Sequence, residues 1–472
     1  MDAATALIVT LVTYKVLLLG VGFWASRRTH DDADFYLAGR GLGPWIAALS
    51  SAASSSSAWT LLGVSGAAYA QGFSAVWLLP ACMGGFLLNW LVVARPLRRE
   101  AERTHAVTLT EYFADGANPK QARRIVISAS IVILLCLLVY VASQFQAAGK
   151  TFAETLDMDF RNAVLIGGAV ILVYTMSGGF WAASITDTIQ GLVMAAASVA
   201  VPVVALWEVG GFGGMWDGLG AAGEGFTDPW KGLNGWMLAS FLVGTLGIGL
   251  GYPGQPHVVN RFMAIRSDRD ITIGTWISIV WGLVIYIGML LAGWCGRAMV
   301  GALGDGEKIL LRLTTDLFSP VTGGIILAAV LSAIMSTADS QLLVCGSTVS
   351  YDLPAKRGTR RVLLDRLTIF GLGLAAMIAA MYLPASVYDN VLFAWSGLGA
   401  AFGPLLLVRL AGHRVKPAFA FAAIWLGFGI TILWSSVPAL DGALYELVPS
   451  FVIAGLVCLA GRMPLEAQAR SS

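Results

Sequence analysis

Long apolar stretches follow one another along nearly the whole of this 472-residue chain. Most of them reach the roughly 20 residues that an α-helix needs to cross a bilayer. Polar and charged residues gather in the short segments between them, and the longest such gap, residues 96–123, is too short to hold a soluble domain. The pattern predicts thirteen membrane-spanning helices, at residues 4–26, 44–71, 75–95, 124–155, 161–178, 186–208, 233–262, 272–299, 318–352, 363–382, 389–410, 417–436 and 441–461.

Composition supports an all-α integral membrane protein. The chain is 57% hydrophobic and only 12% charged, whereas soluble domains average about 25% charged residues. Its mean hydropathy is +0.75. The first span lacks a basic start and a small-residue cleavage site, so we interpret it as a retained helix and not as a signal peptide. We expect Lys15, in the middle of this span, to snorkel toward the membrane surface in preference to facing a neighbouring helix.

The distribution of basic residues orients the chain in the plasma membrane. The net charge is only +2, but most of the 30 basic residues fall in alternate loops. Arg261 is assigned to one of these loops. Because basic loops stay cytoplasmic, this asymmetry predicts an extracellular N-terminus and a cytoplasmic C-terminus. Because orienting the protein in the membrane accounts for the basic loops, no nucleic-acid partner is expected. The five cysteines all lie in apolar spans without CxxC spacing, so neither a disulfide nor a zinc site is expected.

The second span is interrupted by hydroxyl groups. Ser50–Gly66 reads SSAASSSSAWTLLGVSG, and its first half is almost entirely serine and alanine. Buried hydroxyls need hydrogen-bond partners, and non-helical backbone at membrane depth is tolerated where it lines a cavity. A broken helix here indicates a solute or ion site near the middle of the membrane. Close packing of small residues between helices is the alternative.

The seventh span carries a second interruption, at Gly244–His257 (GTLGIGLGYPGQPH). Its prolines cannot sit inside a regular helix without freeing carbonyl groups. The glycines resemble a nucleotide fingerprint, but no strand precedes them, so we reject that interpretation. We expect His257 to cap a helix or to pair at a helix end. Earlier in the chain, Gly178-Gly179 precedes Asp187, which either caps the sixth span or serves as an ion ligand.

The ninth span contains Ala333–Ser340 (AIMSTADS), whose hydroxyls recur at helical spacing. Ser336 and Thr337 share a face with Ala333, and Asp339 adjoins that face. Hydroxyl, carbonyl and carboxylate oxygens suit a hard cation such as sodium. The alternative is a hydroxyl-mediated contact between helices, with Asp339 protonated.

The two interrupted spans are separated by five elements. This spacing predicts two five-helix units of opposite orientation, residues 44–208 and 233–410. Residues 1–43 supply a flanking helix and a cytoplasmic loop, residues 209–232 an extracellular loop, and residues 411–472 the C-terminal flanking helices.

Several long motifs give the chain a specific resemblance to the sodium:solute symporter family, from about Asp34 to about Leu407. The motifs are FYLAGRGLGPW (Phe35–Trp45), YTMSGGFWAASITDTIQ (Tyr174–Gln190), GLGYPGQPHVVNRFMA (Gly249–Ala264), AIMSTADSQLLVCGS (Ala333–Ser347) and WSGLGAAFGP (Trp395–Pro404). The resemblance implies a LeuT-type core, a five-plus-five inverted repeat whose first and sixth helices are broken. It also implies sodium-coupled import of a small organic solute by alternating access, most closely an amino acid such as proline.

The resemblance also implies roles for particular residues. The coupling sodium would be bound by Ala53, Ser56, Ala333, Ser336 and Thr337. A second cation or a proton would be held at Asp187, Asp339 and Ser340, with Ser336 nearby. The solute would be bound by Ser55, Ser57, Ala58, Trp59, Tyr140, Ile248 and Tyr252.

Three of these solute positions depart from the proline-transporting members of the family. Ser55 stands where those members have an aspartate, Ala58 replaces a glycine, and Ile248 replaces a tryptophan. The added methyl group and the lost indole change the shape of the pocket, so a different small carboxylate or zwitterion is an alternative solute.

Other interpretations of the function stay open at this point. The same fold driven by protons would use Asp339 or Asp187 as the titrating group. A transporter-like solute sensor is expected to carry a signalling domain, which the pattern does not predict. An enzyme is the least favoured class, because neither HExxH nor GxSxG occurs. The pattern gives no oligomeric state.

Overall fold

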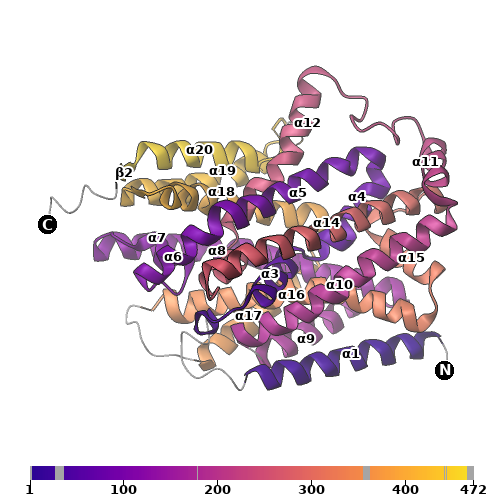
Figure 1. Ribbon diagram of the computed structural model, residues 1–472, viewed down its shortest axis with the longest axis horizontal. Helices are drawn as coiled ribbons and strands as arrows, with labels where there is room; N and C mark the ends of the chain where they lie inside the picture. The colour runs from indigo at the N-terminus through magenta and orange to yellow at the C-terminus, as the bar shows by residue number, and fades with distance from the viewer. Residues whose placement is uncertain are drawn as a thin grey trace.

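The computed structural model describes residues 3–26, 37–177, 179–354, 362–440, 442 and 444–464, nearly all of them in helices (Figure 1). The α-helices are α1 (Ala3–Ser26), α3 (Pro44–Ser55), α4 (Val64–Gln71), α5 (Leu78–Leu87), α6 (Ala94–Thr104), α7 (Leu109–Ala114), α8 (Pro119–Leu156), α9 (Phe160–Ser177), α10 (Phe180–Glu208), α11 (Gly211–Ala222), α12 (Gly235–Gly247), α13 (Pro256–Met263), α14 (Asp268–Met299), α15 (Ile309–Leu317), α16 (Pro320–Ser347), α17 (Val362–Ala380), α18 (Val387–Leu410), α19 (Pro417–Ser436) and α20 (Leu447–Ala460). Short 3₁₀ or π-helical segments are η1 (Ala38–Arg40), η2 (Trp59–Gly63), η3 (Gly72–Trp77), η4 (Leu88–Val93), η5 (Ile248–Gly254), η6 (Gly306–Lys308) and η7 (Thr348–Asp352).

A helix or an interrupted helix lies in each range where the sequence predicts an apolar span. Within the described residues, nine helices are long and apolar enough to cross a membrane, and two shorter apolar helices accompany them. The long helices lie side by side along the longest axis of the molecule, with the start of α1 and strand β2 (Arg462–Pro464) at opposite ends (Figure 1).

Both predicted interruptions are confirmed. α3 ends at Ser55, Ser56 leaves helical geometry (φ −105°, ψ 78°), and the helix resumes as η2 and α4. In the second case α12 tightens into η5, Gln255 is extended (φ −93°, ψ 102°), and Pro256 opens α13. Proline suits this position because the first residues of a helix need no intrahelical N–H bond.

The start of α10 corrects one expectation. The helix begins at Phe180, directly after Gly179, whose backbone is extended (φ −126°, ψ −171°). Asp187 therefore lies two turns inside α10 and is fully buried. The interpretation of Asp187 as the cap of this helix is wrong.

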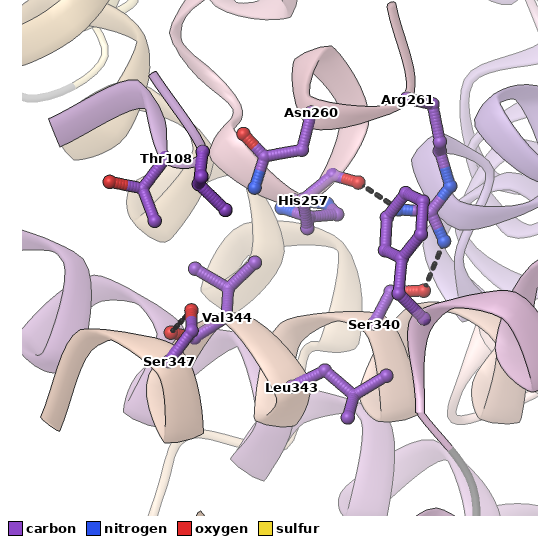
Figure 2. Close-up of a pocket in the computed structure, with 10 residues that line it drawn as sticks. Thr108, His257, Asn260, Arg261, Ser340, Leu343, Val344 and Ser347 are labelled. Carbon is purple, nitrogen blue, oxygen red and sulfur yellow. Dashed lines mark hydrogen bonds between the residues drawn. The ribbon is translucent and has the colours of Figure 1, made fainter. Parts of the chain in front are cut away.

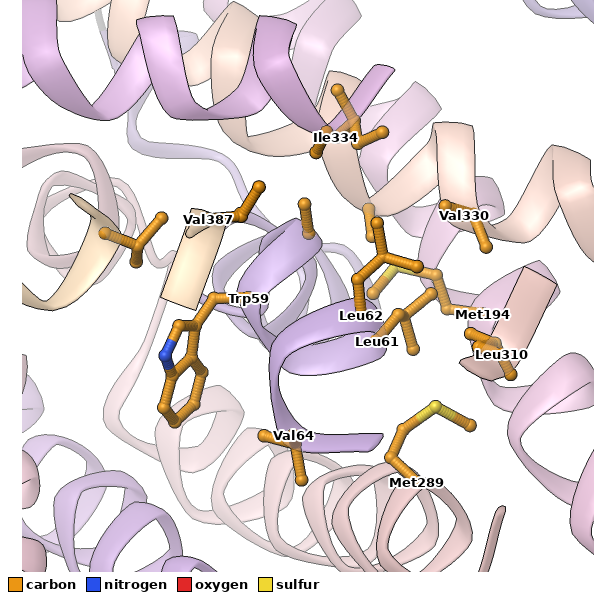
Figure 3. Close-up of a cluster of buried hydrophobic side chains, with 14 of the residues drawn as sticks. Trp59, Leu61, Leu62, Val64, Met194, Met289, Leu310, Val330, Ile334 and Val387 are labelled. Atoms are coloured by element: carbon orange, nitrogen blue, oxygen red, sulfur yellow. The ribbon is translucent and has the colours of Figure 1, made fainter. Parts of the chain in front are cut away.

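α16 occupies the centre of the molecule and packs against α10, α8, α1 and α3. Its side chains are almost all buried from Ile326 to Ser347. Beside it, the chain after the serine break is anchored in an apolar cluster (Figure 3). The cluster joins η2 and α4 to α10, α14, α15 and α16 through Leu61, Leu62, Val64, Met194, Met289, Leu310, Val330 and Ile334. Apolar packing thus fixes one end of the broken segment and leaves its polar backbone facing α16.

One element departs from the all-α expectation. Strand β1 (His413–Val415) follows α18 and pairs antiparallel with β2, which follows α20. A turn through Gly412, whose φ is +83°, separates α18 from β1. The strands tie the last two helices to the end of α18 and do not reach the serine break.

Candidate ion and solute site

The end of α3 meets the middle of α16 through two hydroxyl groups. Ser336 Oγ donates to the carbonyl of Ala53 at 3.1 Å, and Thr337 Oγ1 donates to the carbonyl of Ser54 at 3.1 Å. Ser336 Oγ also lies 3.3 Å from the carbonyl of Ala333. The last carbonyls of a helix have no intrahelical partner, so the break after Ser55 frees these oxygens to face α16.

This junction fits a hard cation without needing a carboxylate. Carbonyl and hydroxyl oxygens from two helices converge, and unwound backbone carbonyls are typical sodium ligands in transporters. Four of the five predicted ligands are therefore on facing segments, namely Ala53, Ala333, Ser336 and Thr337. The fifth, Ser56, is the first residue beyond α3, and its buried Oγ has no hydrogen-bond partner among the described residues. Across all the residues that the structure describes, no group of three or more His, Cys, Asp or Glu side chains could hold a metal ion.

A buried ion pair between Asp187 of α10 and Arg261 of α13 contacts α3 and α16 close to this junction. Asp187 Oδ2 accepts hydrogen bonds from Ser50 (2.9 Å), Ser54 (3.1 Å) and the Arg261 guanidinium (2.9 Å). Arg261 also bonds Ser50 and Ser340, at 2.8 and 2.6 Å. Its side chain is only 2% exposed. The assignment of Arg261 to a loop is therefore wrong: α13 carries it into the core, where it supplies positive charge to Asp187.

Asp339 completes this polar cluster. Its Oδ1 accepts from Ser340 at 3.3 Å, while the other oxygen, Oδ2, is buried without a hydrogen-bond partner in the described residues. The same holds for Oδ1 of Asp187. The structure thus brings together Asp187, Asp339 and Ser340 as the sequence predicts. Two unpaired carboxylate oxygens within low dielectric would be stabilised by a cation or by a proton.

Lys15 faces a neighbouring helix and does not snorkel. Its ammonium contacts the sulfur of Met335 on α16 and lies 5.3 Å from the ring of Tyr14. Tyr14 shares a hydrogen bond of 2.5 Å with Ser332, also on α16. The favoured expectation for Lys15 was wrong because α1 packs along α16, and this contact covers the lysine stem before it can turn toward the surface.

The first group of predicted solute residues lies where α8 crosses the broken segment. Tyr140 donates a long hydrogen bond of 3.4 Å to Ser57, and Gln144 accepts one of 3.0 Å from the backbone N–H of Ala58. Trp59 stacks on Tyr388 of α18 with ring centroids 5.4 Å apart. The indole N–H of Trp59 and the amide nitrogen of Gln144 are buried donors with no partner among the described residues. A buried donor left unpaired is costly, so these two groups are suited to an acceptor brought by a ligand.

The remaining predicted solute residues lie in two separate environments, Tyr252 and Ile248 in one and Ser55 in the other. Tyr252 shares a 3.2 Å hydrogen bond with Tyr286 and packs edge-on against Trp395, and the carbonyl of Ile248 accepts from the Trp395 indole at 3.1 Å. Ser55 Oγ turns back to its own helix and donates to Ala52 at 2.9 Å. No described hydrogen bond or ring contact joins Tyr252 or Ile248 to the Ser57–Tyr140 group.

Gln144 and Arg261 belong to the candidate site but were not among the predicted site residues. The signal for Gln144 was present, since it is an amide inside an apolar span and needs partners. Arg261 gave no such signal, because it follows a proline break and resembles the basic residues of a loop.

A small cavity opens beside the ion pair (Figure 2). It measures about 30 Å³, enough for one or two waters at roughly 10–15 Å³ each. His257, Asn260 and Arg261 line one side from α13, and Ser340, Leu343, Val344 and Ser347 line the other from α16 (Figure 2). His257 neither caps a helix nor lies at the surface: its ring is buried and stands edge-on to Tyr140 at 6.0 Å.

The opposite end of the broken segment is closed by a charged contact. Lys150 of α8 bonds Asp305 and Glu307 at 2.7 and 2.5 Å. Glu307 in turn accepts from the backbone N–H groups of Val387 and Tyr388, at 3.1 and 2.7 Å. A carboxylate at a helix N-terminus is stabilised by unpaired N–H groups and the helix dipole. The contact therefore holds α8, η6 and the start of α18 together above Trp59.

A multi-pass helical protein whose broken helices present free carbonyls to a neighbouring helix belongs to the class of secondary transporters. The chain matches the sodium:solute symporter family over residues 35–427, and it belongs to that family.

Curated relatives match over nearly the whole chain. The osmoregulated proline transporter OpuE of Bacillus subtilis (strain 168) is 34% identical, covering 96% of this chain and 94% of its own length. The sodium/proline symporter of Escherichia coli (strain K12) is 35% identical, covering 97% and 92%. The high-affinity proline transporter PutP of Bacillus subtilis (strain 168) is 34% identical, covering 92% and 93%.

Solved structures share the fold. A Na⁺-coupled sialic acid symporter, in a substrate-bound outward-open state, has a TM-score of 0.81 with 17% identity, covering 98% of this chain and 97% of that one. Mhp1, a nucleobase-cation-symport-1 family transporter in a closed conformation with bromovinylhydantoin bound, has a TM-score of 0.56 with 15% identity, covering 94% and 99%.

Proposed function

We propose that this protein imports proline together with sodium by alternating access across the plasma membrane. The observation that carries the proposal is the junction of Ser336 and Thr337 with the carbonyls freed at the end of α3. Relatives named as proline transporters are 34–35% identical over almost the entire chain, which supports proline as the solute.

The core is a LeuT-type inverted repeat within thirteen membrane spans, with the N-terminus outside and the C-terminus cytoplasmic. Its two units are residues 44–208 and 233–410, and each has a broken helix near its start, at Ser56 in one and at Gln255 in the other. The start of α3 and the end of α13 are joined by backbone bonds between Leu42 and Ala264 and between Arg266 and Leu42, both 3.1 Å. The first broken helix thus begins where the second one ends, as units of opposite orientation require.

Sodium binds between α3 and α16 and couples the ion to the solute. The ion replaces the hydroxyl-to-carbonyl bonds of Ser336 and Thr337 and fixes the end of α3 against α16. Ser57 and Ala58 follow that end directly, so a rigid α3 terminus positions the segment that contacts the solute. This link gives sodium a means to raise solute affinity, and by reciprocity the solute raises sodium affinity.

The solute is bound where α8 crosses the broken segment. The carboxylate of an amino acid accepts hydrogen bonds, and the unpaired donors of Trp59 and Gln144 are suited to provide them. The apolar faces of Trp59 and Tyr388 suit a pyrrolidine ring. The Lys150–Glu307 contact separates the solute site from the extracellular side. The cavity beside Arg261 is the beginning of the path by which the solute leaves toward the cytoplasm.

Binding measured with and without sodium tests this function. We expect purified protein to bind radiolabelled proline at least several-fold more tightly in sodium than in potassium at constant pH. A matched panel of other amino acids and small carboxylates identifies the preferred solute. If another solute binds more tightly than proline, that solute takes the place of proline in the proposed function, and the sodium mechanism is unchanged.

Tyr140→Phe should weaken proline binding several-fold and leave sodium binding nearly intact. The change removes only the hydroxyl that bonds Ser57 in the broken segment, and a buried hydrogen bond contributes roughly 0.5–1.5 kcal/mol, or up to about tenfold. Tyr69→Phe is the matched control, since its hydroxyl bonds the carbonyl of Gly301 and no predicted solute residue. Equal proline affinity in Tyr140→Phe and parent would make the hydroxyl a contact between helices only.

Coupling to protons is the second candidate, favoured by the unpaired Asp339 Oδ2. If Asp339 belongs to a cation site, Asp339→Asn should weaken sodium binding strongly, because it removes a charge from low dielectric. If Asp339 carries a proton, sodium binding should survive and the pH dependence of transport should vanish. Sodium titrations and uptake at several pH values separate the two, and no change in either would leave Asp339 with a structural role.

A further inference from the structure

Far from the serine break, a basic cavity of about 250 Å³ lies between α6, the end of α18 and β1. Five arginines and a histidine line it, together with one acidic side chain, Glu100. The basic residues are Arg95, Arg99, Arg103, Arg409, His413 and Arg414. They come from two segments that are far apart in the chain and adjoin in the fold at one end of the molecule (Figure 1). The cavity is far larger than the roughly 10–15 Å³ that a single water needs.

The guanidinium groups here outnumber the carboxylates beside them in the described residues, and Glu100 pairs only with Arg103, at 2.7 Å. Asp115 lies 3.6–3.9 Å from three of them, those of Arg103, Arg409 and Arg414. None of the three is within hydrogen-bond distance of Asp115 Oδ2, which has no such partner among the described residues. On the other flank Asp268 is shared by Arg95, Arg98 and Arg99. Guanidinium groups held together in this way repel one another, and an anion between them relieves the repulsion.

One wall of the basic cavity is rigid. Arg409 has only 6% of its side chain exposed, and it donates to the carbonyls of Phe113 (3.1 Å) and Asp115 (3.3 Å). Its guanidinium also lies 4.7 Å from the ring of Tyr112. By contrast Arg99 and Arg103 are more than half exposed, at 64% and 52%. Arg99 bonds Asp268 and Arg103 bonds Glu100, so the site pairs one buried guanidinium with two exposed ones whose carboxylate partners are at the rim.

The basic cavity adjoins the surface that faces lipid. The residues just before α6 include Leu91 and Val92, which are apolar and 63% and 48% exposed. Arg95 lies three residues after Val92. Basic pockets directly beyond a membrane span are where anionic lipid head groups bind. The positive-inside asymmetry requires basic residues on this side, but it does not require two distant segments to converge on one hollow.

We propose that the basic cavity binds a phosphate group, either the head group of an anionic phospholipid or free phosphate. Several arginines arranged around a cavity match phosphate, because each guanidinium offers paired N–H donors to its oxygens. The inference goes beyond solute transport, and its test needs no transport.

The test compares Arg99→Gln/Arg103→Gln with the parent and with Arg124→Gln, using the purified full-length protein. Arg124 is an exposed arginine on α8 outside the basic cavity, so its variant controls for loss of charge. Phosphatidylglycerol or phosphatidylcholine is added, and retained lipid is counted by native mass spectrometry alongside the melting temperature. We expect parent and control to retain phosphatidylglycerol over phosphatidylcholine, and the double variant to bind phosphatidylglycerol about tenfold more weakly.

Two results would argue against a lipid site: the parent retains both lipids equally, or the double variant binds phosphatidylglycerol as well as Arg124→Gln does. If inorganic phosphate also fails to bind, either result overturns the proposal. A further arm with millimolar inorganic phosphate distinguishes the sources. Phosphate that raises the melting temperature of the parent but not of the double variant assigns free phosphate to the site. Phosphatidylglycerol binding that phosphate cannot displace assigns the lipid head group.

Discussion

Replacing Ser336 and Thr337 together by alanine is expected to abolish the stimulation of proline binding by sodium. Among the described hydrogen bonds, these two hydroxyls are the only side-chain groups of α16 that bond the backbone carbonyls of Ala53 and Ser54. A helix offers few carbonyls of its own because its ladder occupies them, so the ion would lose both of its side-chain ligands on α16 and keep only the carbonyl of Ala333 there. Sodium can raise solute affinity only through a site that it still occupies.

Ser332→Ala is the matched control for this double variant. It removes another buried hydroxyl one turn away on α16, where Ser332 bonds Tyr14 and the carbonyl of Ala328. The control should keep the parent's sodium dependence, and both proteins should insert, since alanine is well tolerated in membrane helices. Sodium stimulation that persists in a folded double variant, at the parent's sodium concentrations, would move the coupling site away from this junction.

Removing one partner of the buried Asp187–Arg261 pair is expected to destabilise the protein severely. Arg261→Gln leaves the Asp187 carboxylate buried without its counter-charge and also disrupts bonds to Ser50 and Ser340. Breaking a buried ion pair in this way costs about 3–5 kcal/mol. The melting temperature in detergent should fall sharply, and the yield of folded protein with it.

Two further variants make this result specific. Asp187→Asn/Arg261→Gln removes both charges and should recover much of the lost stability, as a double-mutant cycle would measure. Arg266→Gln removes an exposed partner of Asp270, a pair expected to contribute no more than about 1 kcal/mol. Were the double variant no more stable than Arg261→Gln, the ion pair would not be what holds α10, α13 and α3 together.

The hydroxyl-bearing residues of the candidate ion site were predictable because hydroxyl groups are anomalous in apolar spans, whereas Ala53 and Ala333 followed only from the family resemblance. Serines and threonines in apolar helices need hydrogen-bond partners, and this requirement distinguishes Ser50–Ser57, Ser336 and Thr337 from the apolar residues around them. The two helix breaks were predictable for a similar reason, since proline and clustered serines conflict with a continuous membrane helix.

Contacts between distant helices account for most of what the sequence did not predict. The partner of Lys15 is Met335 and that of Arg261 is Asp187, each on a helix far away in the chain. A basic residue near the end of a span has the same local pattern whether it enters water or turns into the core. The start of α10 at Phe180, and hence the depth of Asp187, depended on a helix boundary, which local patterns define poorly.

Uptake of radiolabelled proline into proteoliposomes under an imposed sodium gradient tests sodium-coupled import most directly. Purified parent protein is reconstituted with equal internal and external pH, and an inward sodium gradient is compared with an inward potassium gradient of equal size. We expect sodium to drive accumulation of proline above its external concentration, and collapse of the gradient by a sodium ionophore to release it. Equal accumulation with potassium, or accumulation that follows an imposed pH gradient without sodium, would contradict sodium coupling in this protein.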